Sequence, residues 1–220
     1  DIPAGFKEAL ERSLLATSGN QQDTMLTAVL VTGNKMLATD RHRAVRCTLS
    51  KMSLKPFLLP KRGAEEVIRL GNPKRVAVTS NLAVFDYLNL TLLCRLSEGV
   101  KDFPPVDRLF ENRKAEDPVP DGLKAALHRL VIFAGGDEPL VKASCDLQLT
   151  LMAEGPHGAV TESVDLPKAL FAAKGFGPAK LLAALPYADN IGWGSAATTP
   201  LYLTGEIAGF EYCQSPMSVT

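Results

Sequence analysis

The sequence predicts an α+β fold made of two repeated domains, each with two helices packed on antiparallel sheets. Three observations lead to this expectation. The pattern P-x-G-[FL]-K-x-A-L-x-R occurs at residues 3–12 and again at 120–129. Each copy opens an amphipathic helix, and strand-like segments, a second helix and further strand-like segments follow it in the same order. The 220 residues are 46% hydrophobic and 22% charged, which is enough apolar material for a sizeable core.

In the first copy, apolar residues recur at helical spacing over residues 6–17, and the turn-forming residues 18–20 end this helix. A second helix is expected between Pro60 and Gly71, because Pro is typical of a helix start and Gly-Asn-Pro stops a helix. A Gly33-Asn34 hairpin signal separates the first two strand-like segments. The strand-like segments of this copy are residues 24–31, 36–39, 44–49, 75–80, 82–87 and 90–96.

The second copy repeats this order, with its second helix running from Pro178 through Leu185. Its strand-like segments are residues 147–153, 158–164, 191–195, 201–204 and 210–213. Residues 111–120 are polar and end in two prolines, which suits an extended, exposed connection. We therefore expect one domain over residues 1–112, a second over residues 118–220, and a linker at 111–120.

Charge and cysteine content exclude several classes of protein. The 24 Lys and Arg residues balance the 24 Asp and Glu residues, which argues against a strongly basic nucleic-acid-binding tail but not against local basic faces. No apolar run approaches the roughly eighteen residues of a membrane helix, and no signal peptide is visible, so a cytoplasmic protein without membrane contact is expected. Cys47, Cys94, Cys145 and Cys213 form no close pair, so neither a disulfide framework nor a zinc site is predicted.

Signatures of catalysis are scarce. The sequence has no phosphate-binding P-loop, nucleophile elbow, HExxH motif or EF-hand loop. The segment from Gly175 to Pro178 resembles a glycine-rich loop, but no strand clearly precedes it, and a helix start with Pro in its first turn explains it better. The densest polar cluster runs from Thr39 to Arg43. It reads as a solvated turn; an enzyme with Asp40 and His42 in its site is the alternative, although no nucleophile is evident. No catalytic residue, metal or cofactor is predicted.

Five segments together resemble the bacterial-type DNA polymerase III beta subunit, the replicative sliding clamp. Residues 38–44 read A-T-D-R-H-R-A and are similar to the A-T-D-G-H-R-L signature of that family. The other four are residues 57–61, followed by a helix, residues 96–109, residues 175–185, and the terminal residues 215–219. These matches run through the whole chain in the order of the middle and C-terminal domains of the family.

The resemblance implies a processivity clamp, a non-enzymatic ring protein that encircles double-stranded DNA and needs no cofactor. The helices would line the ring, and their basic side chains would face phosphates without reading sequence. The candidates for this role are Lys7, Arg12, Lys61, Arg62, Arg69, Lys124, Arg129 and Lys180. Ring closure would come from head-to-tail self-association, with a clamp loader opening the ring. Ordinary solvated helix faces are the alternative explanation for these side chains.

The resemblance also implies a hydrophobic pocket between the two domains, where DNA polymerase, the clamp loader and repair proteins insert short linear peptides. Its expected wall comprises Leu26, Thr39, Arg41, His42, Arg43, Ala44, Pro104, Arg108, Leu109, Cys213, Pro216, Met217 and Val219. Four positions depart from the family pattern: Arg41 replaces Gly, Ala44 replaces Leu, and Ser218-Val219 replaces Arg-Leu. We therefore expect an altered peptide preference.

The N-terminal domain of the family has no counterpart, and the sequence begins with Asp1, so we expect a two-domain fragment of a longer clamp or a short clamp from a phage or plasmid. A fragment would be a monomer in isolation, whereas a trimer would favour a short clamp with six domains from three chains. The alternative function is a clamp-like peptide-binding module that no longer encircles DNA.

Overall fold

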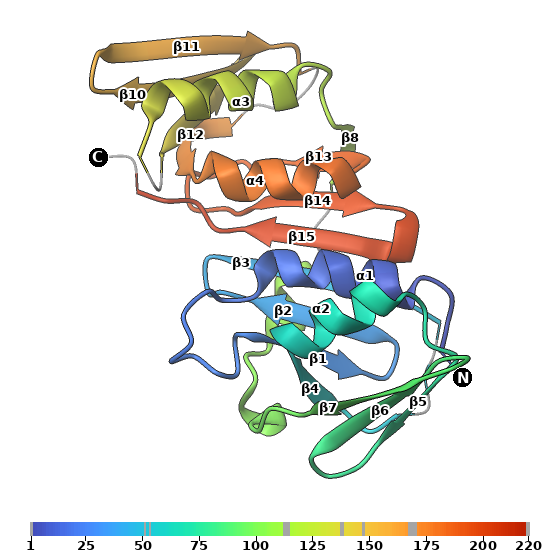
Figure 1. Cartoon of the computed structure of the whole chain (residues 1–220). Helices are drawn as coiled ribbons and strands as arrows, with labels where there is room; N and C mark the ends of the chain where they lie inside the picture. Colours follow the sequence, from blue (N-terminus) through green and yellow to red (C-terminus); the bar gives the residue numbers. More distant parts are fainter. Residues whose placement is uncertain are drawn as a thin grey trace. The chain divides into compact units, whose positions relative to one another are not determined.

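The computed structural model describes residues 2–50, 52, 54–111, 115–136, 139–146, 148–166 and 171–218 (Figure 1). These residues form two compact units. Unit 1 comprises Asp1–Asn112 together with Gly205–Tyr212, and unit 2 comprises Arg113–Thr204 together with Cys213–Thr220. None of the helices in the described ranges is long and apolar enough to cross a membrane.

Two helices cover one face of the first sheet in unit 1 (Figure 1). Helix α1 (Phe6–Ser13) follows Gly5, which has a φ of 81°, and continues into the 3-10 turn η1 (Leu14–Ala16). Helix α2 (Lys61–Leu70) starts after Pro60 and ends at Gly71, as the sequence predicted. Both helices bury a narrow apolar stripe against the strands, which is the expected geometry of an amphipathic helix on a sheet.

The strands of unit 1 form two antiparallel sheets. In the first, the order is β4 (Phe57–Pro60), β1 (Ala28–Thr32), β2 (Lys35–Thr39) and β3 (Arg43–Thr48), with β15 (Phe210–Gln214) next to β3. The second has the order β5 (Arg75–Val78), β6 (Leu82–Asp86) and β7 (Thr91–Arg95). Two 3-10 turns, η2 (Val100–Asp102) and η3 (Val106–Phe110), follow β7.

Unit 2 is built in the same way. Helix α3 (Leu123–Ala134) packs on a sheet of order β11 (Gly158–Val164), β10 (Leu149–Gly155), β9 (Val141–Cys145) and β12 (Phe171–Phe176). Helix α4 (Pro178–Ala184) starts with Pro178 in its first turn, continues into η4 (Leu185–Tyr187), and packs beside α3. The short strands β8 (Asp117–Pro118), β13 (Asn190–Gly192) and β14 (Leu201–Gly205) pair in the order β14-β13-β8, and η5 (Ile207–Gly209) precedes β15.

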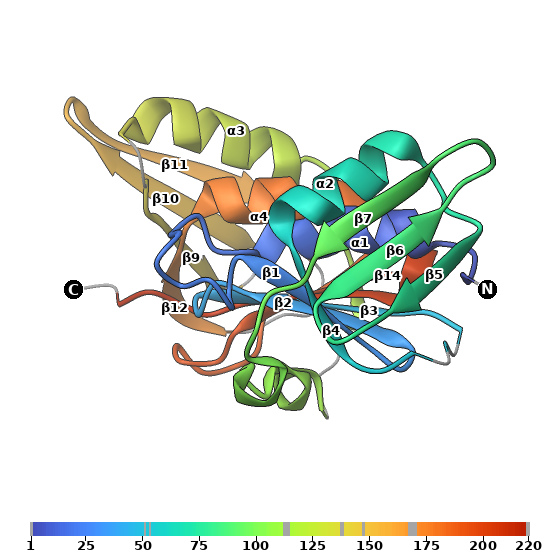
Figure 2. The same ribbon diagram turned by 60° about the horizontal axis from the view of Figure 1, so that its bottom comes forward.

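The strand orders show that the two units repeat one topology (Figure 2). In unit 1 the first sheet runs β4-β1-β2-β3, and in unit 2 it runs β12-β9-β10-β11. In both units, the first strand after the opening helix (β1 or β9) therefore lies between the second strand (β2 or β10) and the fourth (β4 or β12). This confirms the predicted α+β fold with a repeated helix-and-sheet domain. The further division at residues 111–120 stays a prediction.

The sequence analysis missed four strands. Strands β4, β8, β9 and β12 were not expected, and residues 24–27 form a turn where the strand-like segment 24–31 was predicted to begin. The expectation that no strand precedes Gly175-Phe176-Gly177-Pro178 was wrong, because β12 leads directly into α4. The alternation of β12 is broken by a register shift between Phe171 and Lys174, which hides the strand from a search for period-two patterns.

All four cysteines are buried, and none of them forms a disulfide. In the described part of the chain, no group of three or more His, Cys, Asp or Glu side chains is arranged to hold a metal ion.

Candidate functional site

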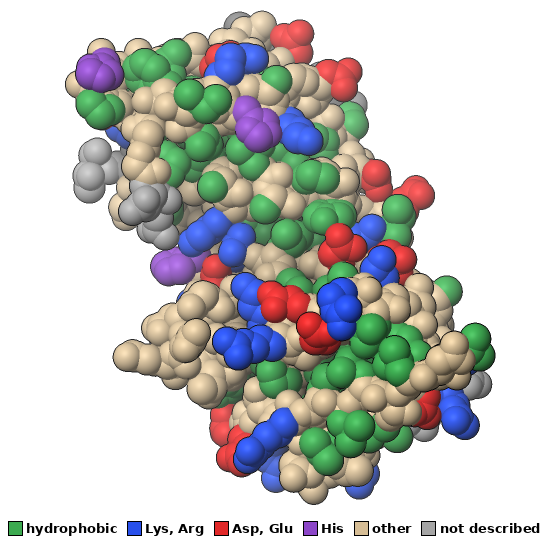
Figure 3. Space-filling model, viewed as in Figure 1, with side chains coloured by type: hydrophobic (Ala, Val, Ile, Leu, Met, Phe, Trp, Pro, Cys, Tyr) green, Lys and Arg blue, Asp and Glu red, His purple; other side chains and the backbone are tan. Residues whose placement is uncertain are grey.

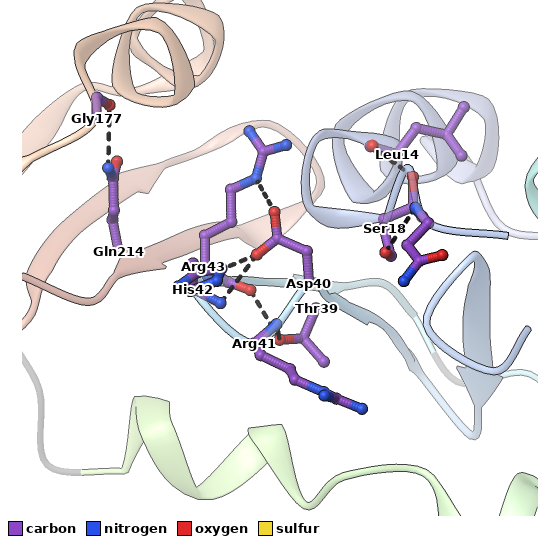
Figure 4. A network of polar contacts seen from close by, with 11 residues as sticks. Leu14, Ser18, Thr39, Asp40, Arg41, His42, Arg43, Gly177 and Gln214 are labelled. Atoms are coloured by element: carbon purple, nitrogen blue, oxygen red, sulfur yellow. Dashed lines mark hydrogen bonds and ion pairs between the residues drawn. The ribbon is translucent and has the colours of Figure 1, made fainter. Parts of the chain in front are cut away.

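The turn between β2 and β3 gathers five of the residues that the resemblance assigned to a peptide-binding pocket. The Asp40 carboxylate organises this turn, accepting hydrogen bonds from the amides of His42 (3.0 Å) and Arg43 (2.9 Å) and from Arg43 Nε (2.9 Å) (Figure 4). Thr39 Oγ1 donates to the Arg43 carbonyl at 2.8 Å and accepts from the Arg41 amide at 3.1 Å. This local network fixes the turn and leaves the Arg41 and His42 side chains exposed.

Arg41 is in the left-handed region of backbone space, with a φ of 76°. A side chain with a Cβ is strained there, which is why glycine is favoured at such positions. Its guanidinium forms an exposed ion pair with Asp23 at 3.1 Å, and this pair ties the turn to the segment that carries Leu26. Leu26, Thr39 and Ala44 are buried, so they support the turn from below and do not form its reachable surface.

The segment after β7 presents Pro104, Arg108 and Leu109. In η3, Val106 and Phe110 are buried, whereas Arg108 is exposed and Leu109 is 43% exposed. The Asp107 carboxylate, also in η3, anchors the segment to β2 and β3. It bonds to Lys35 Nζ at 2.5 Å and to Arg46 Nη1 at 2.7 Å. The exposed side chains therefore occupy the outer side of an anchored turn.

The charges around Asp107 explain its acidity. Burial acts to raise the pKa of this carboxyl group, but the hydrogen bonds and positive charges of Lys35 and Arg46 outweigh burial, and the pKa is lowered. Arg46 also binds both carboxylate oxygens of Glu211 on β15, and its guanidinium lies 4.9 Å from the centre of the Phe110 ring. Arg46 thus joins η3 and β15 to the centre of β3.

In unit 2, the tail after β15 runs along the edge of β12. Gln214 Nε2 donates to the Gly177 carbonyl at 3.0 Å (Figure 4), and the Met217 amide donates to the Gly175 carbonyl at 2.8 Å. Cys213 is buried, but Met217 is 46% exposed and Pro216 is partly exposed. Val219 lies outside the described residues. A cavity beside the tail, which we call the tail cavity, is lined by Ala173, Lys174, Thr198, Pro200, Pro216 and Met217 among others.

The basic residues assigned to DNA fall on α1 to α4, as predicted, but they differ in availability. Lys61, Arg62 and Lys124 are exposed, and Lys7 and Lys180 are partly exposed. Arg69 is paired with Glu66 at 2.7 Å, and Arg129 binds both carboxylate oxygens of Glu162 at 2.6 and 2.8 Å. Figure 3 shows the resulting mixture of basic and acidic side chains over α1 and α2.

The prediction for Arg12 was wrong. This side chain is buried, its guanidinium donates to the carbonyl of Ile207 in η5, and it lies 6.0 Å from the centre of the Phe210 ring. The turn before β15 covers this position of α1, which no pattern within the helix could indicate. Arg12 therefore holds the β15 turn and cannot face phosphate.

The arrangement of Asp40 and His42 does not support the enzyme alternative. Asp40 receives the backbone amide of His42 and the amide and side chain of Arg43, so its carboxylate orients the turn and not the imidazole. The sequence analysis missed Arg46, Glu211 and Lys174 as important residues. Their partners are distant in sequence, and a single charged residue in a strand gives no signal of where those partners lie.

Comparison with solved structures identifies the fold. The beta sliding clamp of C. crescentus matches with a TM-score of 0.87 at 16% sequence identity, over 99% of this chain and 64% of that chain. The DNA polymerase III beta subunit of Thermotoga maritima matches with a TM-score of 0.83 at 19% identity, over 97% and 63% of the two chains. A putative DNA polymerase III beta subunit of Eubacterium rectale gives 0.81 at 20% identity, over 97% and 63%.

No protein-family model matches the sequence, and no curated protein sequence matches it significantly. The chain spans a little under two thirds of the length of the clamps named above. Within that length the match includes nearly all of its residues. The chain therefore has the fold of the bacterial beta sliding clamps, as its sequence predicted.

Proposed function

We propose that this chain acts as a sliding clamp, or as the larger part of one, that encircles double-stranded DNA and tethers a DNA polymerase as a processivity factor. The observation that carries this proposal is the repeated clamp fold, matched over 97–99% of the chain in independent clamp structures. Partners would include the clamp loader and repair proteins, and the chain would associate head to tail in a ring. Its four cysteines form no disulfide, which suits the cytoplasm.

The DNA-facing role would belong to the exposed basic side chains of the helices. Their distribution favours unit 2, because α3 and α4 carry no acidic residue, whereas α1 and α2 carry Glu8, Glu11, Glu65 and Glu66. Ion pairs reduce the positive charge that Arg69 of α2 and Arg129 of α3 offer. Contacts of this kind are electrostatic and independent of sequence, which suits a protein that moves along DNA.

Peptide recognition would use the exposed residues of the two predicted sets. In unit 1 these are Arg41, His42 and Leu109, held by the Asp40 turn and by anchored η3. In unit 2 they are Pro216 and Met217 beside the tail cavity. Aliphatic surface, an adaptable methionine and polar groups at the edge suit a short peptide with apolar anchors. The charge of Arg41 would favour an acidic residue in such a peptide.

The test is fluorescence polarisation with a labelled clamp-binding peptide from a polymerase, titrated with the full chain and with a chain that lacks Ser215 to Thr220. We expect saturable binding that the truncation removes. Lys142→Ala is the matched control, since Lys142 lies on β9, pairs with exposed Glu154 and is not among the residues that line the tail cavity. Absence of binding to the full chain would contradict the peptide-binding role.

Retention on circular DNA separates the clamp from the alternative module. A clamp that encircles DNA stays on a closed circle and leaves when the circle is cut, whereas a peptide-binding module shows no such dependence. The measurement needs the ring-forming assembly loaded by a clamp loader. Equal loss from closed and cut circles would favour the module.

A further inference from the structure

Lys174 is a buried lysine surrounded by carbonyl oxygens. It lies in β12, at the edge of the unit 2 sheet beside β9 (Figure 2), and only 2% of the residue is exposed. Its Nζ donates to four backbone carbonyls of one loop. The distances are 2.5 Å to Trp193, 2.9 Å to Gly194, 3.1 Å to Ala196 and 3.1 Å to Thr199.

Among the described residues, no carboxylate accompanies this ammonium group and its four carbonyl partners. Lys174 forms no ion pair with an acidic residue of the described chain, and its Nζ lies 5.2 Å from the centre of the Phe171 ring. A buried charge without a carboxylate is costly unless polar groups replace its hydration shell. Here the carbonyl dipoles do so. Rings of backbone carbonyls replace the hydration shell of monovalent cations in the same way.

The loop that carries the four carbonyl groups folds tightly around the Lys174 ammonium group. Gly194 has a φ of 58°, and a Cβ at that position would lie only 2.3 Å from the Thr199 side chain. The Thr199 amide donates to the Ala196 carbonyl at 3.0 Å, and the Ala172 amide of β12 donates to the Ser195 carbonyl at 3.3 Å. Besides these two bonds, the exposed residues 195–198 are held by the bond from Lys174 Nζ to the Ala196 carbonyl.

We propose that Lys174 is the tethered cation of a carbonyl-lined cation site, and that it positions the loop from Trp193 to Pro200 as one wall of the tail cavity. This role rests on the proposed peptide-binding function, because Thr198 and Pro200 of the loop face the same cavity as Pro216 and Met217. Lys174 is thus a positioning residue. It shapes the wall that a peptide anchor meets at this end of the site.

The protonation state agrees with this role. Burial lowers the pKa of Lys174 to about 8, so the amine is mostly protonated at pH 7. The ammonium supplies three N–H donors, which four converging carbonyls can share. A neutral side chain at this position would leave those carbonyls without the charge that holds them together.

The chain carries its own reporter of this loop, because Trp193 is the only tryptophan of the sequence. Its carbonyl accepts from Lys174, and its ring is buried and stacked on Phe171 with 5.0 Å between ring centres. Tryptophan emission and acrylamide quenching therefore measure loop order directly. They do so whether or not any peptide binds.

The test compares Lys174→Ala with the parent chain and with the control Lys142→Ala, in choline chloride, potassium chloride and ammonium chloride at equal ionic strength. We expect Lys174→Ala in choline to shift Trp193 emission to the red and to raise quenching about twofold, as for a residue released from a well-packed site. Potassium or ammonium ions should fill the vacated site and restore the parent signal. The parent chain and Lys142→Ala should not respond to the cation.

The proposal is overturned if Lys174→Ala in choline chloride has the same emission as the parent chain. It is also overturned if neither potassium nor ammonium ions restore the parent signal. Lys174→Met fills a similar volume without charge, so it should shift emission and resist rescue by any cation. If Lys174→Ala does not fold, this variant decides: an emission and quenching equal to those of the parent overturn the proposal.

Peptide binding separates this inference from the proposed function. If the parent chain binds the labelled peptide, Lys174→Ala should weaken binding by about tenfold in choline and recover in potassium. Equal affinity of parent and variant overturns the positioning role. If the parent chain binds no peptide, the proposed function fails, and the emission experiment alone still decides whether Lys174 holds the loop.

Discussion

Replacing Arg46 by Met should destabilise unit 1 through loss of one partly buried network of ion pairs. Arg46 is 16% exposed at its side chain and binds Asp107 at 2.7 Å and both oxygens of Glu211, one of them at 2.8 Å. Methionine retains the apolar stem that packs in the sheet but leaves both carboxylates without this partner. Asp107 keeps its bond to Lys35.

The expected loss is about 2–3 kcal/mol in the free energy of unfolding at pH 7. Hydrogen bonds to charged groups contribute about 1.5–3 kcal/mol each, and removing one partner of a buried pair costs about 3–5 kcal/mol. We expect a loss below the range for a fully buried pair, because the Asp107 and Glu211 side chains remain 37% and 24% exposed and can regain water. Urea unfolding of the two chains measures the difference.

The pH dependence provides a second readout. Because the pKa of Asp107 is lowered in the folded chain, its ion pairs stabilise the fold above the ordinary carboxyl pKa, and this stability is lost as the pH falls through the folded pKa. The difference between the parent and Arg46→Met should therefore shrink below about pH 4. Arg69→Met, which breaks the exposed pair with Glu66, is the control and should leave the urea midpoint unchanged.

A change below about 0.5 kcal/mol in Arg46→Met would refute the reasoning, because it would mean that the network contributes no more than a surface pair. A difference between the chains that persists unchanged into acid would refute the role of Asp107.

Three further predictions concern the turn at Arg41, the loop at Gly194 and the exposed Lys124 of α3. Arg41→Gly should raise stability by about 0.5–1 kcal/mol, since it relieves a positive φ and loses only an exposed ion pair; a lower urea midpoint would contradict this. Gly194→Ala should cost about 1–3 kcal/mol and expose Trp193 to acrylamide, because a Cβ collides with Thr199; parent-like quenching would be the contrary result. Lys124→Ala should lower the slope of log affinity for DNA against log salt by about one, whereas Lys142→Ala should leave it unchanged; equal slopes for Lys124→Ala and the parent would exclude a phosphate contact.

Local sequence signals predicted most of the regular structure. Pro60 and Gly71 mark the ends of α2, and Pro178 marks the first turn of α4, because the conformational limits of these residues act on their own segment. The repeated pattern at residues 3–12 and 120–129 predicted two similar domains, and the strand orders of the two units agree with it.

Strand β12 was missed because its side chains do not alternate between apolar and polar as a strand pattern requires. A register shift interrupts its alternation, and a lysine stands where an apolar residue would be expected. That lysine is acceptable only because four carbonyls from residues 193–199 surround it. The loop lies about twenty residues further along the chain, beyond the reach of any periodicity.

The sequence by itself determined the repeated α+β fold, the ends of several helices, the turn around Asp40 and the resemblance to sliding clamps. Only the tertiary structure decided which basic side chains remain available, that Arg12 is covered by the β15 turn, and that Arg46 and Lys174 organise the segments beside the candidate site. The physical reason is the sequence separation over which each kind of interaction acts. Helix caps and turns depend on neighbours a few residues away, whereas burial and charge pairing depend on contacts between distant segments that form only when the chain folds.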